Sequence, residues 1–153
     1  MQRAIIFVLS LFVAVTIGVE DDFVEGIAQA LVLERSDVET CMNKTNVQLE
    51  DLENVDKLLI SNLQTDEIDE SALKVGCLFA CLAQKKEIMS GARINNDKIK
   101  KILDAKMPPN LDPEIIADRD HILDLCADRV KSKINECEVA FRYMICFGSN
   151  FTA

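Results

Sequence analysis

The sequence predicts an all-α fold, a compact domain of six helices stapled by disulfides, on three observations. Apolar residues recur at helical rather than alternating spacing along most of the chain. Six cysteines, an even number, are spread along it. No internal repeat or Pro/Gly-rich linker divides its 153 residues, a length that suits one domain better than two.

The first residues have the features of a secretory leader. Arg3 supplies a charged start, residues 4–15 are almost wholly apolar, and small residues precede a cleavage point near Gly18. The apolar run is shorter than the roughly 20 residues that span a membrane, and no later stretch is long enough, so we expect no stable membrane insertion. We predict a signal peptide over residues 1–18 and one helical domain over residues 19–153, in a secreted, extracellular protein.

The chain is acidic and poor in residues that serve catalysis. It has 17 Lys and Arg against 26 Asp and Glu, and loss of Arg3 with the leader leaves 16 against 26, a formal charge of −10. Because phosphate groups are bound by clustered cations, we expect no nucleic acid and no anionic membrane as partner. His121 is the only histidine, Tyr143 is the only tyrosine, and tryptophan is absent. We therefore predict no enzyme and no cofactor.

The first two predicted helices lie before residue 61. Residues 21–41 form the first, and Arg35 interrupts its apolar stripe, so we expect a bend there. That stripe consists of Phe23, Ile27, Ala30 and Leu31. A short second helix carries Leu49, Leu52 and Leu58 or Leu59.

Capping signals bound the third and fourth helices. Ser71 can cap a helix over residues 72–90, which Gly91 ends in the left-handed conformation. Asn95 or Asn96 begins the fourth helix, which stops at the sequence Met107-Pro108-Pro109.

The last two helices also have clear starts. Asp112 as cap and Pro113 at the first helical position begin the fifth. Its predicted inward stripe consists of Ile115, Ile122, Cys126 and Val130. The sixth helix covers residues 135–146.

Two predicted helices contain segments without a clear polar face. Residues 72–83 are interrupted only by Lys74 and Gly76, and residues 139–145 only by Arg142. A helix that is apolar all round is buried on several sides. Solid packing and an internal hydrophobic cavity both satisfy this pattern.

All the cysteines follow the predicted cleavage point, so three disulfides are expected among Cys41, Cys77, Cys81, Cys126, Cys137 and Cys146. Six cysteines allow about 15 pairings. Cys77 and Cys81 lie one helical turn apart on one face, so each can hold a different distant element. No pair of C-x-x-C motifs is present and the single histidine is not near a cluster of cysteines, so no metal site is predicted.

The spacing Cys41-x35-Cys77-x3-Cys81-x44-Cys126-x10-Cys137-x8-Cys146 resembles the six-cysteine signature of insect odorant-binding proteins, the pheromone-binding and general odorant-binding family. The short gaps and the similar segment over residues 81–91 are its specific parts, and the resemblance covers nearly all of the chain after the leader. It implies six helices with the pairs Cys41–Cys81, Cys77–Cys137 and Cys126–Cys146. It also implies an enclosed hydrophobic pocket that carries small apolar molecules through aqueous fluid.

Such a pocket needs inward apolar residues and one or two polar groups. The candidates are Phe23, Ile27, Phe79, Met89, Ile102, Met107, Ile115, Ile122, Tyr143, Met144 and Phe147. Each is equally compatible with ordinary core packing, or for Tyr143 with a water-facing position. Tyr143 is the candidate polar group, because its hydroxyl can hydrogen-bond an alcohol, aldehyde or ester oxygen.

Moth pheromone binders are associated with acid release through histidines and a long C-terminal segment. Here the only histidine, His121, lies beside Asp120 in a charged stretch that we interpret as solvated, and the chain stops soon after Cys146. Any acid release would instead involve carboxylates or residues 147–153.

Two functions fit these observations. The first is a secreted carrier of odorants, pheromones or similar apolar semiochemicals, whose partners are a small hydrophobic ligand and a chemosensory receptor. The alternative is a secreted helical signalling or venom-like factor that acts on a protein receptor and has a filled core. Either is compatible with a homodimer. A secreted phospholipase is excluded, because no cysteine adjoins His121 and the chain has no Gly-rich calcium loop.

Two sequons can accept N-glycans in the secretory pathway. Asn43-Lys44-Thr45 is the candidate glycosylation site. Asn150-Phe151-Thr152 lies too near the end of the chain for efficient use.

Overall fold

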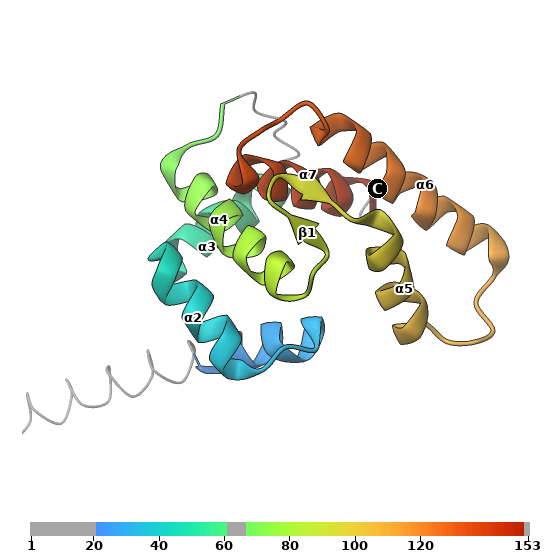
Figure 1. The fold of residues 1–153 in the computed structure, drawn as a ribbon, viewed down its shortest axis with the longest axis horizontal. Coiled ribbons are helices and arrows are strands. Elements are labelled where there is room, and N and C mark those ends of the chain that lie inside the picture. The colour runs from blue at the N-terminus through green and yellow to red at the C-terminus, as the bar shows by residue number, and fades with distance from the viewer. Residues whose placement is uncertain (1–20, 61–66, 152–153) are drawn as a thin grey trace, which may run out of the picture. The chain divides into compact units, whose positions relative to one another are not determined.

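The computed structural model describes residues 21–60 and 67–151, and their secondary structure is almost entirely helical, which confirms the all-α class (Figure 1). The predicted leader over residues 1–18 lies outside the described residues. The chain divides into two parts, residues 1–40 and 41–153, which are described separately.

The N-terminal part contains a helical break instead of the predicted bend. Residues 21–31 are helical, the chain leaves the helix at Val32 with a φ of 54°, and α2 (Arg35–Thr45) follows. A positive φ is unfavourable for a β-branched residue and does not continue a right-handed helix. The side chain of Arg35 forms an ion pair with Asp21. The predicted single helix over residues 21–41 is therefore wrong.

The next two helices are α3 (Leu49–Ile60) and α4 (Glu70–Lys85). The side chains of Leu58 and Leu59, expected in α3, lie outside the described residues. The cap of α4 is Asp69, whose carboxylate accepts from the Ala72 N–H at 2.7 Å. The predicted cap, Ser71, lies inside the helix.

A β-hairpin replaces the last turn of the predicted third helix. After α4 ends at Lys85, β1 (Met89–Ser90) pairs antiparallel with β2 (Arg93–Ile94). Glu87 has a φ of 57° and the Ile88 N–H bonds to the Ala83 carbonyl, which closes the helix early. Gly91 does adopt the left-handed conformation, with φ of 55°, but it does so in the hairpin turn.

Three further helices follow: α5 (Asn96–Lys106), α6 (Pro113–Val130) and α7 (Glu136–Phe151). Asn95 and Asp112 accept backbone N–H groups at the starts of α5 and α6, so both predicted caps are confirmed. Asn135 does the same for α7. That helix continues past Cys146, where it was predicted to end.

The inward face of α6 differs from the predicted stripe at its first turns. Its buried residues are Arg119, Leu123, Cys126 and Val130, at intervals of four, three and four. Ile115 is 50% exposed, so its predicted place on the buried face is wrong. The charged residue Arg119 occupies the position one turn further along and is only 1% exposed.

Disulfides join the helices of residues 41–153. The bonds are Cys41–Cys81, Cys77–Cys137 and Cys126–Cys146, the pairs that the resemblance implies. The most extensive contact between helices in this part is between α4 and α7. Their backbones meet at Gly76, where an added Cβ would lie 2.2 Å from the Cys137 carbonyl oxygen. Only glycine therefore fits at this crossing.

None of the helices within residues 21–60 and 67–151 combines the length and the apolar character needed to cross a bilayer.

Candidate functional site

An apolar cluster lies where α4, the hairpin, α6 and α7 meet. Its buried members are Ala80, Met89, Val130, Val139 and Ala140, and its half-buried members are Phe79, Ala83, Ala92, Ile94 and Tyr143. Three of the predicted pocket residues, Phe79, Met89 and Tyr143, are thus brought together from segments far apart in the sequence.

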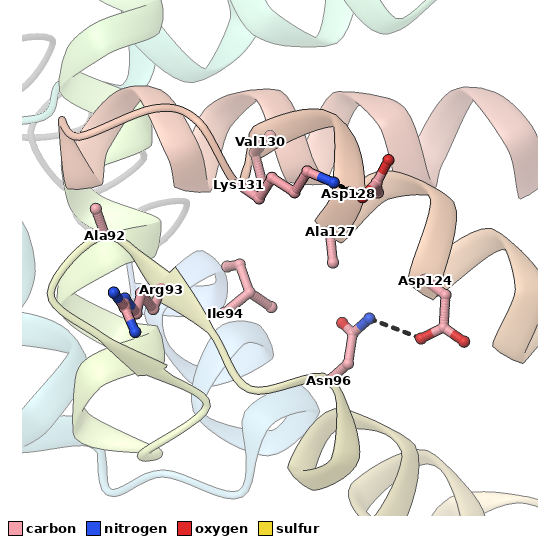
Figure 2. A pocket seen from close by; sticks show the side chains of 9 residues that line it. All are labelled: Ala92, Arg93, Ile94, Asn96, Asp124, Ala127, Asp128, Val130 and Lys131. Carbon is pink, nitrogen blue, oxygen red and sulfur yellow. Dashed lines mark hydrogen bonds and ion pairs between the residues drawn. The ribbon is translucent and has the colours of Figure 1, made fainter.

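An open cleft of about 490 Å³ borders this cluster (Figure 2). It is lined by Ala92, Arg93, Ile94, Asn96, Asp124, Ala127, Asp128, Val130 and Lys131. Three of these, Ala92, Ile94 and Val130, also belong to the cluster, so the cleft has an apolar side that continues into it. Its polar side is formed by Arg93, Asn96, Asp124, Asp128 and Lys131. Figure 2 shows the hydrogen bond that joins Asn96 and Asp124.

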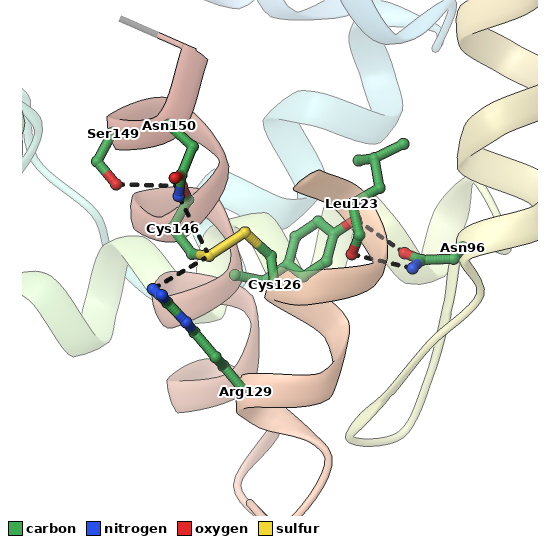
Figure 3. The surroundings of a disulfide bond; sticks show 8 residues. Asn96, Leu123, Cys126, Arg129, Cys146, Ser149 and Asn150 are labelled. Carbon is green, nitrogen blue, oxygen red and sulfur yellow. Dashed lines mark hydrogen bonds between the residues drawn. A yellow bond between two sulfur atoms is a disulfide. The ribbon is translucent and has the colours of Figure 1, made fainter. Parts of the chain in front are cut away.

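The side chain of Asn96 connects the cleft with the cluster. Its Oδ1 accepts a hydrogen bond from the Tyr143 hydroxyl at 2.9 Å. Its Nδ2 donates to the Leu123 carbonyl and to Asp124 Oδ1, each at 3.0 Å. The hydrogen bond from Asn96 to the Leu123 carbonyl is drawn in Figure 3. One amide therefore links the Tyr143 hydroxyl to the lining of the cleft.

The charges around this amide favour fixed protonation states. Lys100 Nζ lies 2.9 Å from Asp124 Oδ1, and this hydrogen bond, with a smaller one from Asn96, lowers the pKa of Asp124. Burial raises the pKa of the Tyr143 hydroxyl, with a further effect from the nearby charge of Asp124. At neutral pH the carboxyl group is ionised and the phenol keeps its proton.

The remaining predicted pocket residues are not members of this cluster. Half-buried positions are occupied by Phe23, Ile27, Ile102, Met107, Ile122, Met144 and Phe147. The first two belong to residues 1–40, which are described separately. The Met107 sulfur accepts a hydrogen bond from Arg119 Nη1 at 3.2 Å, so it faces a cation. Their role as pocket lining stays a prediction.

Arg119 is a charged residue whose burial the sequence did not predict. Its Nη2 donates to Asp104 Oδ1 on α5 at 2.8 Å and to Asp120 Oδ1 at 2.6 Å. Arg119 belongs to the charged stretch that was predicted to be solvated, and His121 in the same stretch is exposed. The signal that could have found Arg119 is its helical spacing from Leu123 and Cys126 on the inward face.

A second open cleft, of about 360 Å³, lies over two of the disulfides. Cys77, Cys81 and Cys137 line it together with Lys44, Thr45, Glu70, Leu73, Lys74, Gln84 and Glu136. It contains none of the predicted pocket residues, and its charged rim is less suited to an apolar ligand.

The third disulfide is surrounded by polar contacts (Figure 3). Arg129 Nη1 lies 3.8 Å from Cys146 Sγ, and Asn150 Nδ2 donates to the Cys146 carbonyl at 2.7 Å. Asn150 is half-buried, and Thr152 of its sequon lies outside the described residues. Asn43 of the other sequon is exposed on α2. In the described part of the chain no group of three His, Cys, Asp or Glu is arranged to hold a metal ion.

These features define a small helical binding domain stapled by three disulfides, with an apolar cluster and a bordering cleft. The model of the PBP/GOBP family matches residues 30–150, so the chain belongs to this family, the insect odorant-binding proteins. Members of the family are binding proteins rather than enzymes, and their ligands are small and hydrophobic. No curated protein matches the sequence.

Proposed function

We propose that this protein is a secreted carrier that binds an odorant, a pheromone or a similar apolar semiochemical and transports it through aqueous extracellular fluid. Membership in the PBP/GOBP family, over residues 30–150, is the observation that carries the proposal. Transport of this kind requires reversible binding of an apolar molecule and no reactive group. A chemosensory receptor and a second copy of the chain stay predicted partners.

The ligand would bind against the apolar cluster of Phe79, Met89, Tyr143 and their neighbours. Burying apolar ligand surface contributes about 25 cal/mol per Å² before the cost of association is subtracted. Met89 adds adaptability, because its thioether side chain fills irregular space. The cleft bordered by Ala92, Ile94 and Val130 offers an approach to this cluster from solvent.

Displacement of an environment-sensitive apolar fluorophore tests the proposal. Oxidised, delipidated protein is expected to take up the probe at one saturable site, from which long-chain alcohols, esters, fatty acids and terpenoids displace it selectively. Phe79→Ala should weaken uptake, while Ile134→Ala, at a side chain that is 94% exposed, is the matched control and should leave it unchanged. Circular dichroism checks that both variants fold. Failure of the correctly bonded protein to take up any probe would contradict the carrier function and favour a signalling factor with a filled core.

Secretion is tested independently in insect cells that express the full chain. We expect the protein in the medium with its N-terminus near Val19, as cleavage near Gly18 requires. The exposed Asn43 is the proposed glycan acceptor, so glycosidase treatment should increase gel mobility, and Asn43→Gln should abolish that change. Asn150→Gln is the matched control, since the Asn150 amide nitrogen is engaged with Cys146. Retention of the intact chain in the cells would contradict the predicted leader.

A further inference from the structure

The orientation of the Asn96 side-chain amide is fixed by its surroundings. Its nitrogen donates to the main-chain carbonyl of Leu123 and to the carboxylate of Asp124. A carbonyl and an ionised carboxylate only accept hydrogen bonds. Rotating the amide by 180° would place Oδ1 against both acceptors and break both bonds. The oxygen of Asn96 must therefore face the other way, toward Tyr143.

This orientation decides what the Tyr143 hydroxyl does with its proton. The hydroxyl oxygen lies 2.9 Å from Asn96 Oδ1, and an amide oxygen has no proton to give. The hydroxyl must therefore donate. Burial keeps the phenol protonated by raising its pKa, so this single proton is present and engaged. The lone pairs of the hydroxyl oxygen are what it can still offer to another group.

The hydroxyl also lies where a ligand in the cluster would meet it. The Tyr143 side chain packs against the buried residues of the cluster, and its hydroxyl end contacts Asn96, which lines the open cleft. A molecule that places its apolar chain against the cluster and its polar end toward the cleft would bring that end to this oxygen.

We infer that Asn96 is a specificity-determining residue that makes Tyr143 a hydrogen-bond acceptor, so that the site prefers apolar ligands ending in a hydroxyl group over aldehydes, ketones and esters of the same length. The inference rests on the proposed function and deepens it. An alcohol donates its proton to the Tyr143 oxygen. A carbonyl group can only accept, so at the Tyr143 oxygen it would meet a second acceptor and gain no hydrogen bond there to replace those it loses to water.

Matched ligands of one chain length test this preference on the full oxidised protein. Dodecanol should displace an apolar fluorophore at about tenfold lower concentration than dodecanal, a ratio that corresponds to about 1.4 kcal/mol. Tyr143→Phe removes the hydroxyl and should bring the two ligands within about twofold of each other, a difference of only a few tenths of a kcal/mol.

Variants at Asn96 separate its effect on Tyr143 from a general effect on folding. Asn96→Ala leaves the Tyr143 proton free to be donated to a carbonyl, so the alcohol preference should vanish or reverse toward dodecanal. If Asn96 had only a structural role, the substitution would weaken the binding of both ligands equally. The ratio of their displacing concentrations would then stay unchanged. Lys100→Met is the matched control, because Lys100 contacts Asp124 and has no bond to Tyr143 among the described hydrogen bonds; it should leave the ratio unchanged.

The outcomes distinguish this inference from the proposed function. Saturable probe uptake with equal displacement by dodecanol and dodecanal would overturn the specificity while leaving the carrier intact. An alcohol preference that survives in Tyr143→Phe, or is unchanged in Asn96→Ala, would overturn the role of these two residues. If no probe binds to the folded wild-type protein, the proposed function itself is wrong.

Discussion

The α4–α7 pair and the α5–α6 pair are held together by different physical forces. Between α4 and α7 the Cys77–Cys137 bond brings two Cα atoms within 4.1 Å, and Gly76 lets the backbones touch. No side chain of α5, which is described over its whole length, is buried. Polar contacts from Asp104, Asn96 and Lys100 attach it to α6.

We call the α4–α7 pair the frame, because a disulfide and apolar contacts hold it together. The contacts between α5 and α6 are mainly polar. Covalent and apolar contacts of the first pair are insensitive to salt and mild acid. Hydrogen bonds and ion pairs of the second pair are weakened by salt, which screens exposed ion pairs, and by acid below about pH 4, which protonates their carboxylates. The polar group that we assign to ligand selection, Asn96, lies in the second pair.

Removing the frame disulfide should have the largest effect. In the loop-entropy model, the double change Cys77→Ala and Cys137→Ala, which opens a loop of 60 residues, lowers the free energy of unfolding by about 4 kcal/mol. The same change at Cys126 and Cys146, with 20 residues, costs about 3 kcal/mol. Urea unfolding of the oxidised proteins measures both. A larger loss at Cys126 and Cys146 would contradict the assignment of α4 and α7 as the frame.

Gly76→Ala should be the next most damaging change. The new methyl group would overlap the Cys137 carbonyl oxygen, which is main chain and can move only with the helix, so we expect a loss of about 1–3 kcal/mol or more. Thermal unfolding measures it. Gly26→Ala is the matched control. Gly26 lies in a helical segment, and no atom lies within 4 Å of the added methyl group, so this substitution should raise the free energy of unfolding by about 0.5–1 kcal/mol. Equal effects at the two glycines would show that α4 and α7 are not in backbone contact.

Arg119→Ala should loosen α5 while leaving the frame intact. It removes the guanidinium that bonds to Asp104 and Asp120, at a cost of about 1–3 kcal/mol. Hydrogen exchange should show faster exchange in α5 with α4 unchanged. Arg119→Met keeps much of the buried volume and should recover part of the loss. Equal acceleration in α4 and α5 would mean that the two regions unfold as one unit.

Acid should lower the free energy of unfolding only slightly, and only at low pH. The pKa of Asp124 is lowered by its bond to Lys100, that of Asp51 by the Gln48 N–H, and that of Glu138 by Arg142. A lowered pKa in the folded state means that the stabilising contribution is complete above the unfolded values, 3.8 for Asp and 4.5 for Glu, and is lost as pH falls through the folded values. These groups should therefore cause little change between about pH 7 and pH 5 and a decline below about pH 4.

Urea unfolding at a series of pH values measures this decline. Asp124→Asn should make it shallower, and Asp118→Asn, at an exposed carboxylate on the same helix, is the control. A large loss of stability already between pH 7 and pH 5 would contradict the assignment of the decline to these carboxylates.

Local signals predicted much of the fold. Asn95 and Asp112 begin helices because their short polar side chains accept backbone N–H groups, a property that is visible in a few residues of sequence. The third helix was predicted too long, because Gly91 satisfies a helix end and a hairpin turn equally well. Ser71 is an acceptable cap, but in the fold it donates to Asp51 on α3, and Asp69 caps the helix in its place.

The candidate site was predicted only in part. Phe79, Met89 and Tyr143 were chosen as inward apolar residues, and the structure brings these three together. Ile115 was chosen on the same periodicity and is half exposed. Hydrophobic spacing identifies one face of a helix, but which turns of that face are covered depends on where the neighbouring helix ends.

The sequence by itself determined the helical class, the starts of α5, α6 and α7 and the cysteine spacing that identifies the family, because each of these depends on residues close together in the chain or on a fixed pattern. Only the tertiary structure decided that Arg119 is buried and that Asn96 turns its oxygen toward Tyr143. Both depend on partners from other helices: Asp104 for Arg119, and the Leu123 carbonyl with Asp124 for Asn96. The direction of a hydrogen bond at a binding site is set by all the groups that surround it, and these meet only in the folded chain.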